Sequence, residues 1–218
     1  QSTRDKDYLN TLTLLNQLGA NPNALAEGPF GGTDIVKNGN VITQALLKGS
    51  PALVAQLLDM DAKVPFRFAP EGFWGEQAGY AETLLLLTQD EQWQLVDRLF
   101  AAGANPDARL VDGDTLLLKA VSEGELTVVQ KLLEHGATSG LVGESAEPVF
   151  PLWRAVENNN IELVKLLISA SADPNQRNTQ QANQTSLMLA LQRNYKAISL
   201  YLMENGANLS AKDLSGMS

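Results

Sequence analysis

The chain has 218 residues, a formal net charge of −9 and no cysteine. The lack of cysteine excludes disulfides, thiolate metal sites and cysteine nucleophiles. The negative charge, without any run of basic residues, argues against nucleic acid or anionic lipid as the partner. Apolar runs such as Leu84–Leu87 are far shorter than the roughly 20 residues that cross a membrane, so we expect no direct membrane insertion.

The first predicted element is an amphipathic helix from about Asp7 to Leu18. The repeats described below each pair an inner helix with an outer helix. No inner helix can be recognised before this first helix, so residues 1–28 are expected to form a half-repeat that caps the array. Asn16 and Gln17 give this helix the polar side that terminal repeats need. The chain begins with Gln1 rather than Met, which favours a processed product or a trimmed chain.

A three-residue phrase, Gly-Ala-Asn/Asp or a variant of it, recurs along the whole chain. Its first members are Gly19, Asp61, Gly103, Gly136, Ser171 and Gly206, which lie 42, 42, 33, 35 and 35 residues apart. A marker with a period near 33 residues is typical of a helical repeat array. Since stacked repeats share one continuous core, we expect a single domain over residues 1–218.

Five units follow the cap and begin near residues 40, 82, 115, 150 and 185. Each opens with a stretch such as Thr115–Ala120, which predicts an inner helix. Four residues later comes a position that suits a left-handed turn, occupied by Gly49, Glu91, Gly124, Asn159 and Asn194. Apolar pairs spaced four residues apart then predict an outer helix. The marker phrase closes that helix, and a finger projects beyond it.

The openings of these units resemble the Thr-Pro-Leu-His-x-Ala motif of the ankyrin repeat. The resemblance implies an all-α ankyrin-repeat solenoid of about five full repeats plus the N-terminal half-repeat. It also implies that fingers and inner helices form a concave, partner-binding surface. The usual His is replaced by Thr43, Leu85, Leu118, Trp153 and Met188, so apolar packing is expected in its place. Ser218 falls where a next repeat would begin, which favours truncation or removal of a tail.

Two fingers are long, because 21 residues separate Gly19 from Asn40 and Asp61 from Glu82, against 12 from Gly103 to Thr115. Loops of that length are often functional or disordered. The second long finger gathers aromatic residues and an arginine, the residue types that dominate interface energetics. We predict partner contacts at Arg67, Phe68, Phe73, Trp74 and Tyr80. The alternative is that these rings brace their own loop.

The two positions before each interhelical turn are expected to face the groove, and the finger tips add to them. The further predicted partner-binding residues are Lys37, Lys48, Gln89, Asp90, Asp112, Asp114, Glu123, Glu147, Trp153, Glu157, Gln192 and Arg193. The middle of this strip is acidic, which favours a basic patch on the partner. A solvated face with no partner would show the same mixture, so both interpretations stay open.

Candidate catalytic and metal sites are weak. His135 is the only histidine, so a zinc site without cysteine is very unfavourable. The segment Gly28–Thr33 is glycine-rich but lacks the lysine of a phosphate-binding loop. The segment Gly143–Glu147 lacks the closing glycine of a nucleophile elbow. We therefore predict a protein that is not an enzyme and has no cofactor or metal.

The leading hypothesis is a module that binds one folded protein. A finer hypothesis is an inhibitor or immunity protein that blocks an enzyme or toxin, such as a secreted hydrolase. It rests on similarity to bacterial exported ankyrin proteins and implies a periplasmic or membrane-anchored location, with the cytoplasm as the other option. The alternative hypothesis is a bacterial effector, or a recruitment module of a larger enzyme, that binds a host protein.

Overall fold

The computed structural model describes residues 10–11, 13–14, 17–23, 42, 45, 50–64, 81, 84–88, 90–110, 112–143 and 149–216. The chain divides into two compact units, Gln1–Val111 and Asp112–Ser218, and each is described by itself. That residues 1–218 form a single domain stays a prediction.

In the first unit, two helices are paired. Helix α3 spans Pro51–Asp59 and α5 spans Trp93–Ala101, and the two pack against each other. Six of the residues in the predicted apolar pairs are buried, namely Leu53, Val54, Leu57, Leu95, Val96 and Leu99, whereas Leu58 and Phe100 are half-buried. Residues 10–11, 13–14 and 17 are also helical, within the range predicted for the cap.

The marker phrase at Gly103 lies against the backbone of the preceding finger. The N–H of Val64 donates to the carbonyl of Ala102 over 2.7 Å. A Cβ at residue 103 would lie 2.8 Å from the carbonyl oxygen of Val64, and the φ of Gly103 is +99°. Both the close approach and the left-handed backbone require glycine here.

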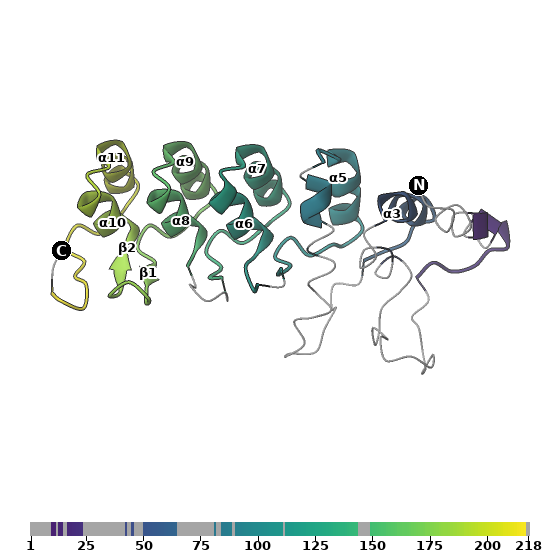
Figure 1. The fold of residues 1–218 in the computed structure, drawn as a ribbon, viewed down its shortest axis with the longest axis horizontal. Coiled ribbons are helices and arrows are strands. Elements are labelled where there is room, and N and C mark those ends of the chain that lie inside the picture. The colour runs from purple at the N-terminus through teal and green to yellow at the C-terminus, as the bar shows by residue number, and fades with distance from the viewer. Residues whose placement is uncertain are drawn as a thin grey trace. The chain divides into compact units, whose positions relative to one another are not determined.

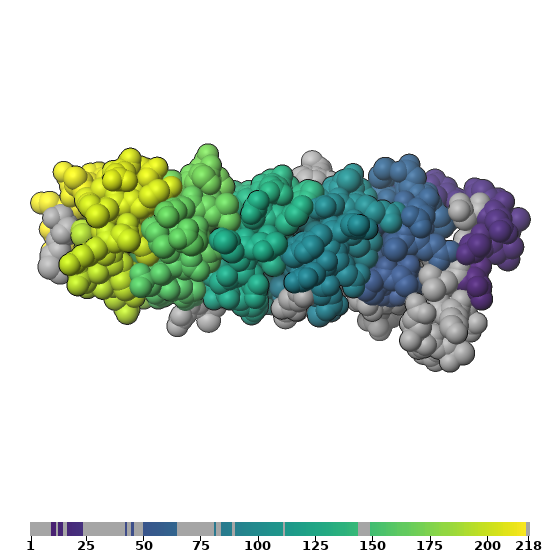
Figure 2. Space-filling view, turned by 90° about the horizontal axis from the view of Figure 1, so that it is seen from above, coloured from purple at the N-terminus to yellow at the C-terminus, as the bar shows by residue number. Residues whose placement is uncertain are grey.

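The second unit consists of three helical hairpins. The first is α6 (Leu116–Glu123) with α7 (Leu126–Glu134), the second α8 (Pro151–Glu157) with α9 (Ile161–Ser169), and the third α10 (Ser186–Gln192) with α11 (Lys196–Glu204). The inner helices α6, α8 and α10 pack side by side in one layer, and the outer helices α7, α9 and α11 form the second (Figure 1). Figure 2 shows these hairpins as adjacent bands from teal through green to yellow.

The turns inside the hairpins have the backbone that the sequence predicts. Gly124, Asn159 and Asn194 have positive φ, as does Glu91 in the first unit, whereas Gly49 lies outside the described residues. At the first of these turns the N–H of Glu125 donates to the carbonyl of Ala120 over 3.0 Å. This bond satisfies a carbonyl that the end of α6 would otherwise leave free.

Threonine begins two of the inner helices. The hydroxyl of Thr115 accepts a hydrogen bond from the N–H of Leu118 at 3.1 Å, and that of Thr185 accepts from Met188 at 3.4 Å. These N-caps satisfy a backbone donor in the first turn. Helix α8 has Phe150 at the same position and begins instead with Pro151, whose fixed φ suits a first helical residue.

The fourth position of the inner helices is apolar and buried in the second unit, as expected for the missing histidine. Leu118, Trp153 and Met188 all belong to the core. The ring of Trp153 meets Phe150 edge to face, with centroids 6.2 Å apart and an interplanar angle of 66°. Such edge contacts are favourable between aromatic rings.

The finger before α10 departs from an all-α description because it contains a short antiparallel hairpin. Strand β1 is Arg177–Asn178 and β2 is Gln184–Thr185, with Arg177 opposite Thr185. The guanidinium of Arg177 donates to the carbonyl of Asn183 over 2.8 Å and to that of Lys212 over 2.9 Å. A two-residue strand is too short for the alternation of polar and apolar residues to reveal it.

Side chains near the marker phrase tie successive fingers together. Asn175 donates from Nδ2 to the carbonyl of Gly206 at 2.9 Å, and its Oδ1 accepts from the N–H of Asn208 at 2.7 Å. In the first unit Asn23 makes the same two bonds, to the carbonyl of Asp61 at 3.1 Å and from the N–H of Lys63 at 2.7 Å. One asparagine thus satisfies a donor and an acceptor of the next repeat.

Candidate functional site

Part of the predicted site lies outside the described residues: Lys37, Lys48, Arg67, Phe68, Phe73, Trp74, Tyr80, Gln89 and Glu147. Their roles stay predictions. In the first unit, Asp90 is described and exposed next to the turn at Glu91. The remaining predicted residues belong to the second unit, where the structure places them on the inner helices and the finger that precedes α6.

We call the polar, exposed or half-exposed positions of these elements the inner face. It comprises Asp112, Asp114, Lys119, Ser122, Glu123, Arg154, Glu157, Asn158, Gln192 and Arg193. Asp112 and Asp114 belong to the finger before α6, and the others occupy repeated positions in the middle or near the C-terminal ends of three inner helices that pack side by side. The helices therefore present the residues as a row, while the apolar positions of the same helices are turned to the core.

On α6 an ion pair organises the inner face. Lys119 Nζ lies 3.2 Å from Glu123 Oε1. The hydrogen bond with Glu123 and its negative charge raise the pKa of Lys119, Asp112 and Asp114 raise it further, and desolvation opposes the shift. One lysine thus balances three carboxylates. Because both partners of the pair are substantially exposed, it holds geometry more than it adds stability.

Helix α8 repeats this arrangement with different residues. Arg154 Nη1 lies 2.5 Å from Glu157 Oε2. The side chain of Asn158 donates to the carbonyl of Ser122 over 3.3 Å, which links the end of α8 to the end of α6. Asn158 thus joins two neighbouring positions of the row directly.

Helix α10 presents a different surface. Leu189 stands where α6 has Lys119 and α8 has Arg154, and it is buried. Gln192 and Arg193 remain exposed before the turn. The acidic charge therefore gathers at α6 and α8, and the row becomes neutral to basic at α10.

The finger before α6 places a carboxylate against a neighbouring finger. Asp112 Oδ1 accepts from the N–H of Asp114 at 3.0 Å, which holds the tip of this finger. Asp114 Oδ1 is buried without a hydrogen-bond partner among the described residues. A Cβ at Gly143 would overlap this oxygen and lie 2.7 Å from Leu118 Cδ2. Gly143 is therefore part of the structure that positions Asp114, a role that the sequence did not reveal.

Trp153 is corrected from a predicted partner contact to a core residue. Its exposed fraction is 2%, and its indole packs on Phe150 inside the second unit. The physical reason is its place at the fourth position of the inner helix, which is apolar and buried in all three hairpins of this unit. Arg154, one residue later, is the half-exposed side chain of that turn.

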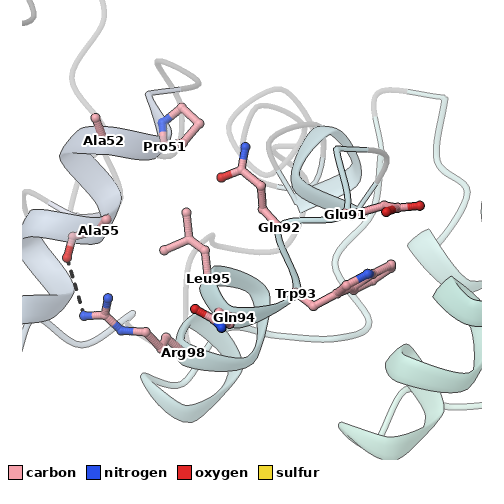
Figure 3. A pocket seen from close by; sticks show the side chains of 9 residues that line it. All are labelled: Pro51, Ala52, Ala55, Glu91, Gln92, Trp93, Gln94, Leu95 and Arg98. Atoms are coloured by element: carbon pink, nitrogen blue, oxygen red, sulfur yellow. Dashed lines mark hydrogen bonds between the residues drawn. The ribbon is translucent and has the colours of Figure 1, made fainter.

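A groove of 720 Å³ lies between α3 and α5 in the first unit. It exists because α3 contributes only small residues to it, namely Pro51, Ala52 and Ala55. Figure 3 shows Leu95 pointing into the space between the helices, with Arg98 reaching across to α3. Arg98 donates to the carbonyl of Ala55 at 3.5 Å and pairs with Asp59 at 2.6 Å.

The described surfaces carry charged and amide side chains that can contact a partner. In the described part of the chain, no group of three or more His, Asp or Glu residues is placed to hold a metal ion. Among the same residues, no helix has the length and apolar character needed to cross a membrane. The inner face offers hydrogen bonds and charges to an approaching surface, with Asp112 and Glu123 exposed and Asp114 and Glu157 half-exposed.

Comparison with known proteins agrees with the repeated architecture. A family model described as ankyrin repeats in three copies matches residues 84–178 and 140–213, together more than half of the chain. The crystal structure of the ankyrin repeat domain of Bcl-3, a member of the IkappaB family, superposes with a TM-score of 0.62. That likeness covers 96% of this chain and 85% of the other at 23% identity, and it concerns the fold.

Two curated relatives extend the comparison. The chain is 30% identical over 139 residues to the nuclear factor NF-kappa-B p105 subunit of Gallus gallus, covering 63% of this chain and 14% of the relative. It is 28% identical over 139 residues to an ankyrin repeat-containing protein of Treponema pallidum, covering 64% and 46%. The chain thus spans less than half the length of either relative. From the repeated hairpins, their turns and the matching family model, we conclude that this chain belongs to the ankyrin-repeat family.

Proposed function

We propose that the chain is a non-enzymatic module that binds a folded protein, and that residues 112–218 do so through the inner face. Ankyrin repeats as a family mediate protein–protein interaction. One observation supports the inner face of residues 112–218 as the binding surface. At equivalent positions of three packed inner helices, the exposed side chains differ in each repeat, namely Ser122 and Glu123, Glu157 and Asn158, then Gln192 and Arg193.

This variation supports recognition because the fold itself does not require it. The buried positions of the same helices are uniformly apolar or small, as packing demands. The exposed positions make only surface ion pairs and hydrogen bonds within the unit, such as Lys119 with Glu123, and they form a row. A row of differing polar groups on a rigid layer of helices suits a specific partner surface better than it suits solvent alone.

The charge of the inner face favours a partner with a basic patch. Lys119 pairs with Glu123, and the charges of Asp112 and Asp114 also raise the pKa of this lysine. Complementary charge on a partner would speed encounter and suppress wrong partners more than it would raise affinity. The overall charge of −9 acts in the same direction at longer range.

The finer proposal is that binding blocks an enzyme or toxin, which would place the protein in the periplasm or at a membrane facing it. The alternative is recruitment of a partner whose own activity continues. The two differ in one measurable consequence. An inhibitor abolishes the partner's turnover at saturation, whereas a recruitment module leaves that turnover unchanged.

The test begins with affinity capture of partners from the native host and identification by mass spectrometry. Binding of the purified partner is then measured for the natural chain and for a triple variant, Glu123→Ala, Glu157→Ala and Gln192→Ala. We expect the triple variant to bind more weakly while it keeps its melting temperature. Undiminished binding by the folded triple variant would show that the inner face is not the interface.

A further inference from the structure

The end of α11 carries a dipeptide that the other described outer helices lack. Asn-Gly occurs twice in the chain, at 38–39, outside the described residues, and at Asn205–Gly206. Asn205 is exposed, and Gly206 has a φ of +89°. In the other marker phrases the residue before the left-handed first member is Leu18, Met60, Ala102, His135 or Ala170.

We propose that Asn205 is a site of spontaneous deamidation, and that the change opens the turn that closes α11. The backbone nitrogen of Gly206 loses its proton to water and attacks Cγ of Asn205. The bond from Cγ to Nδ2 breaks, and the amide nitrogen leaves as ammonia. The resulting succinimide ring adds water at either carbonyl, giving aspartate or isoaspartate at position 205.

The reaction selects Asn205 because the attacking residue has no side chain. Two other exposed asparagines in tight turns, Asn159 and Asn194, precede Asn160 and Tyr195, whose side chains hinder attack. A Cβ built on Gly206 meets nothing within 4 Å, so the side-chain position of the attacking residue is open to solvent.

The attacking nitrogen is also held more weakly than its equivalents. The N–H of Gly206 reaches the carbonyl of Met203 over 3.4 Å. The corresponding bonds from Gly103, Gly136 and Ser171 are each 3.0 Å. A longer bond leaves this amide easier to expose to water and to deprotonate.

The folded turn nevertheless slows the reaction. Asn205 Nδ2 donates to the carbonyl of Tyr201 at 2.8 Å, which holds the side chain back along the helix. Attack requires this bond to break and the backbone to rotate, so the reaction proceeds through local opening of the turn. We expect conversion in the folded chain to be about tenfold slower than in a free peptide, which corresponds to about 1.4 kcal/mol of opening.

Isoaspartate would not fit the turn. It lengthens the main chain by one atom between residues 205 and 206, where the N–H of Ala207 donates to the carbonyl of Leu202 over 3.0 Å. It also shifts the carbonyl of Gly206, which Asn175 binds at 2.9 Å. A new negative charge at the C-terminal end of α11 is unfavourable as well. The contact between the fingers at Asn175 and Asn208 is therefore lost.

The experiment incubates the folded chain at mildly alkaline pH and follows residue 205 by peptide mapping with detection of isoaspartate. A synthetic peptide covering residues 199–212 gives the unprotected rate. Gly206→Ser keeps Asn205 but adds a side chain to the attacking residue, and Ser171 shows that serine is accepted at this position. Asn205→Ala removes the reacting amide and copies Ala102 and Ala170.

We expect isoaspartate at 205 in the natural chain, slower than in the peptide and faster than any change at Asn159 or Asn194. Asn205→Ala should lack it, Gly206→Ser should form it much more slowly, and only the aged natural chain should lose melting temperature. The proposal fails if the folded chain keeps Asn205 intact over a period in which the peptide converts fully. Conversion without loss of melting temperature would refute the proposed opening of the turn.

Discussion

The interior of residues 112–218 and its inner face are built by the same helices and follow opposite rules. The interior repeats itself, so that Thr115 and Thr185 cap two inner helices in the same way and the fourth position is always apolar. The inner face changes at every repeat, from Glu123 through Asn158 to Arg193. Packing constrains the interior, whereas the face is left open to other requirements. The comparison separates residues that make the fold from residues available for recognition.

The largest expected loss of stability comes from replacing Trp153. The sequence predicts this residue on the inner face, but it is buried in the interior. Trp153→Ala should lower the free energy of unfolding by about 3 to 5 kcal/mol through loss of buried contacts and the cavity left behind. Urea denaturation followed by circular dichroism measures this. The control Gln192→Ala, on the face, should change stability by less than about 0.5 kcal/mol. Equal stabilities for the two variants would show that Trp153 is not a core residue and would support its place on the inner face.

A substitution at Gly143 tests the contact between this glycine and Asp114, which lies between the interior and the inner face. Gly143→Ala forces Asp114 and Leu118 to move and should cost about 1 to 3 kcal/mol. The matched control is Gly140→Ala, whose Cβ would lie 3.5 Å from Gln176 Oε1, an ordinary contact. Adding Asp114→Ala to Gly143→Ala should recover part of the loss, as measured by a double-mutant cycle. If Gly143→Ala matches Gly140→Ala in melting temperature, the packing of Asp114 is not as described.

The threonine caps test whether the interior truly repeats. Thr115→Ala and Thr185→Ala should each cost about 1 kcal/mol. The loss at Thr185 should be the smaller one, since its bond to the backbone is 3.4 Å against 3.1 Å. Thermal unfolding gives both values. A null effect at either site would mean that the two helix starts are not equivalent.

The smallest effect concerns the turn at Ser171, a serine with a φ of 65°. Ser171→Gly removes the cost of a left-handed serine and should stabilise the chain by up to about 1 kcal/mol. The reverse change, Gly136→Ser, meets no atom within 4 Å and should cost a similar amount. Calorimetry of the two variants measures whether each substitution raises or lowers the free energy of unfolding. Destabilisation by Ser171→Gly would show that its hydroxyl makes a needed contact.

Sequence reasoning located the turns well, because left-handed backbone restricts residue type and repeats at a fixed spacing. It placed Gly124, Asn159 and Asn194 correctly at the hairpin turns. It missed the role of Gly143, since the clash that excludes a side chain there comes from a finger about 30 residues earlier. The bonds of Asn175 were also missed, although the triplet Asp173–Asn175 has a parallel in Asn21–Asn23 that signals it.

Trp153 was misplaced for a related reason. Helical periodicity predicts which residues share a face of the helix. It does not decide which of two residues at the edge of that face is buried, because that depends on tertiary contacts. Phe150 covers the indole of Trp153, and Arg154 extends from the next position to pair with Glu157. A large aromatic residue beside a groove therefore suggested an interface that packing excludes.

The most direct test of the account uses matched charge reversals on the two layers of the second unit. Glu123→Lys alters the inner face, whereas Glu134→Lys alters the end of outer helix α7 by the same charge. Association with the captured partner is measured by stopped flow at several salt concentrations. We predict that Glu123→Lys slows association and flattens its salt dependence, while Glu134→Lys has a much smaller effect. Equal effects of the two reversals, or none from Glu123→Lys, would contradict recognition through the inner face.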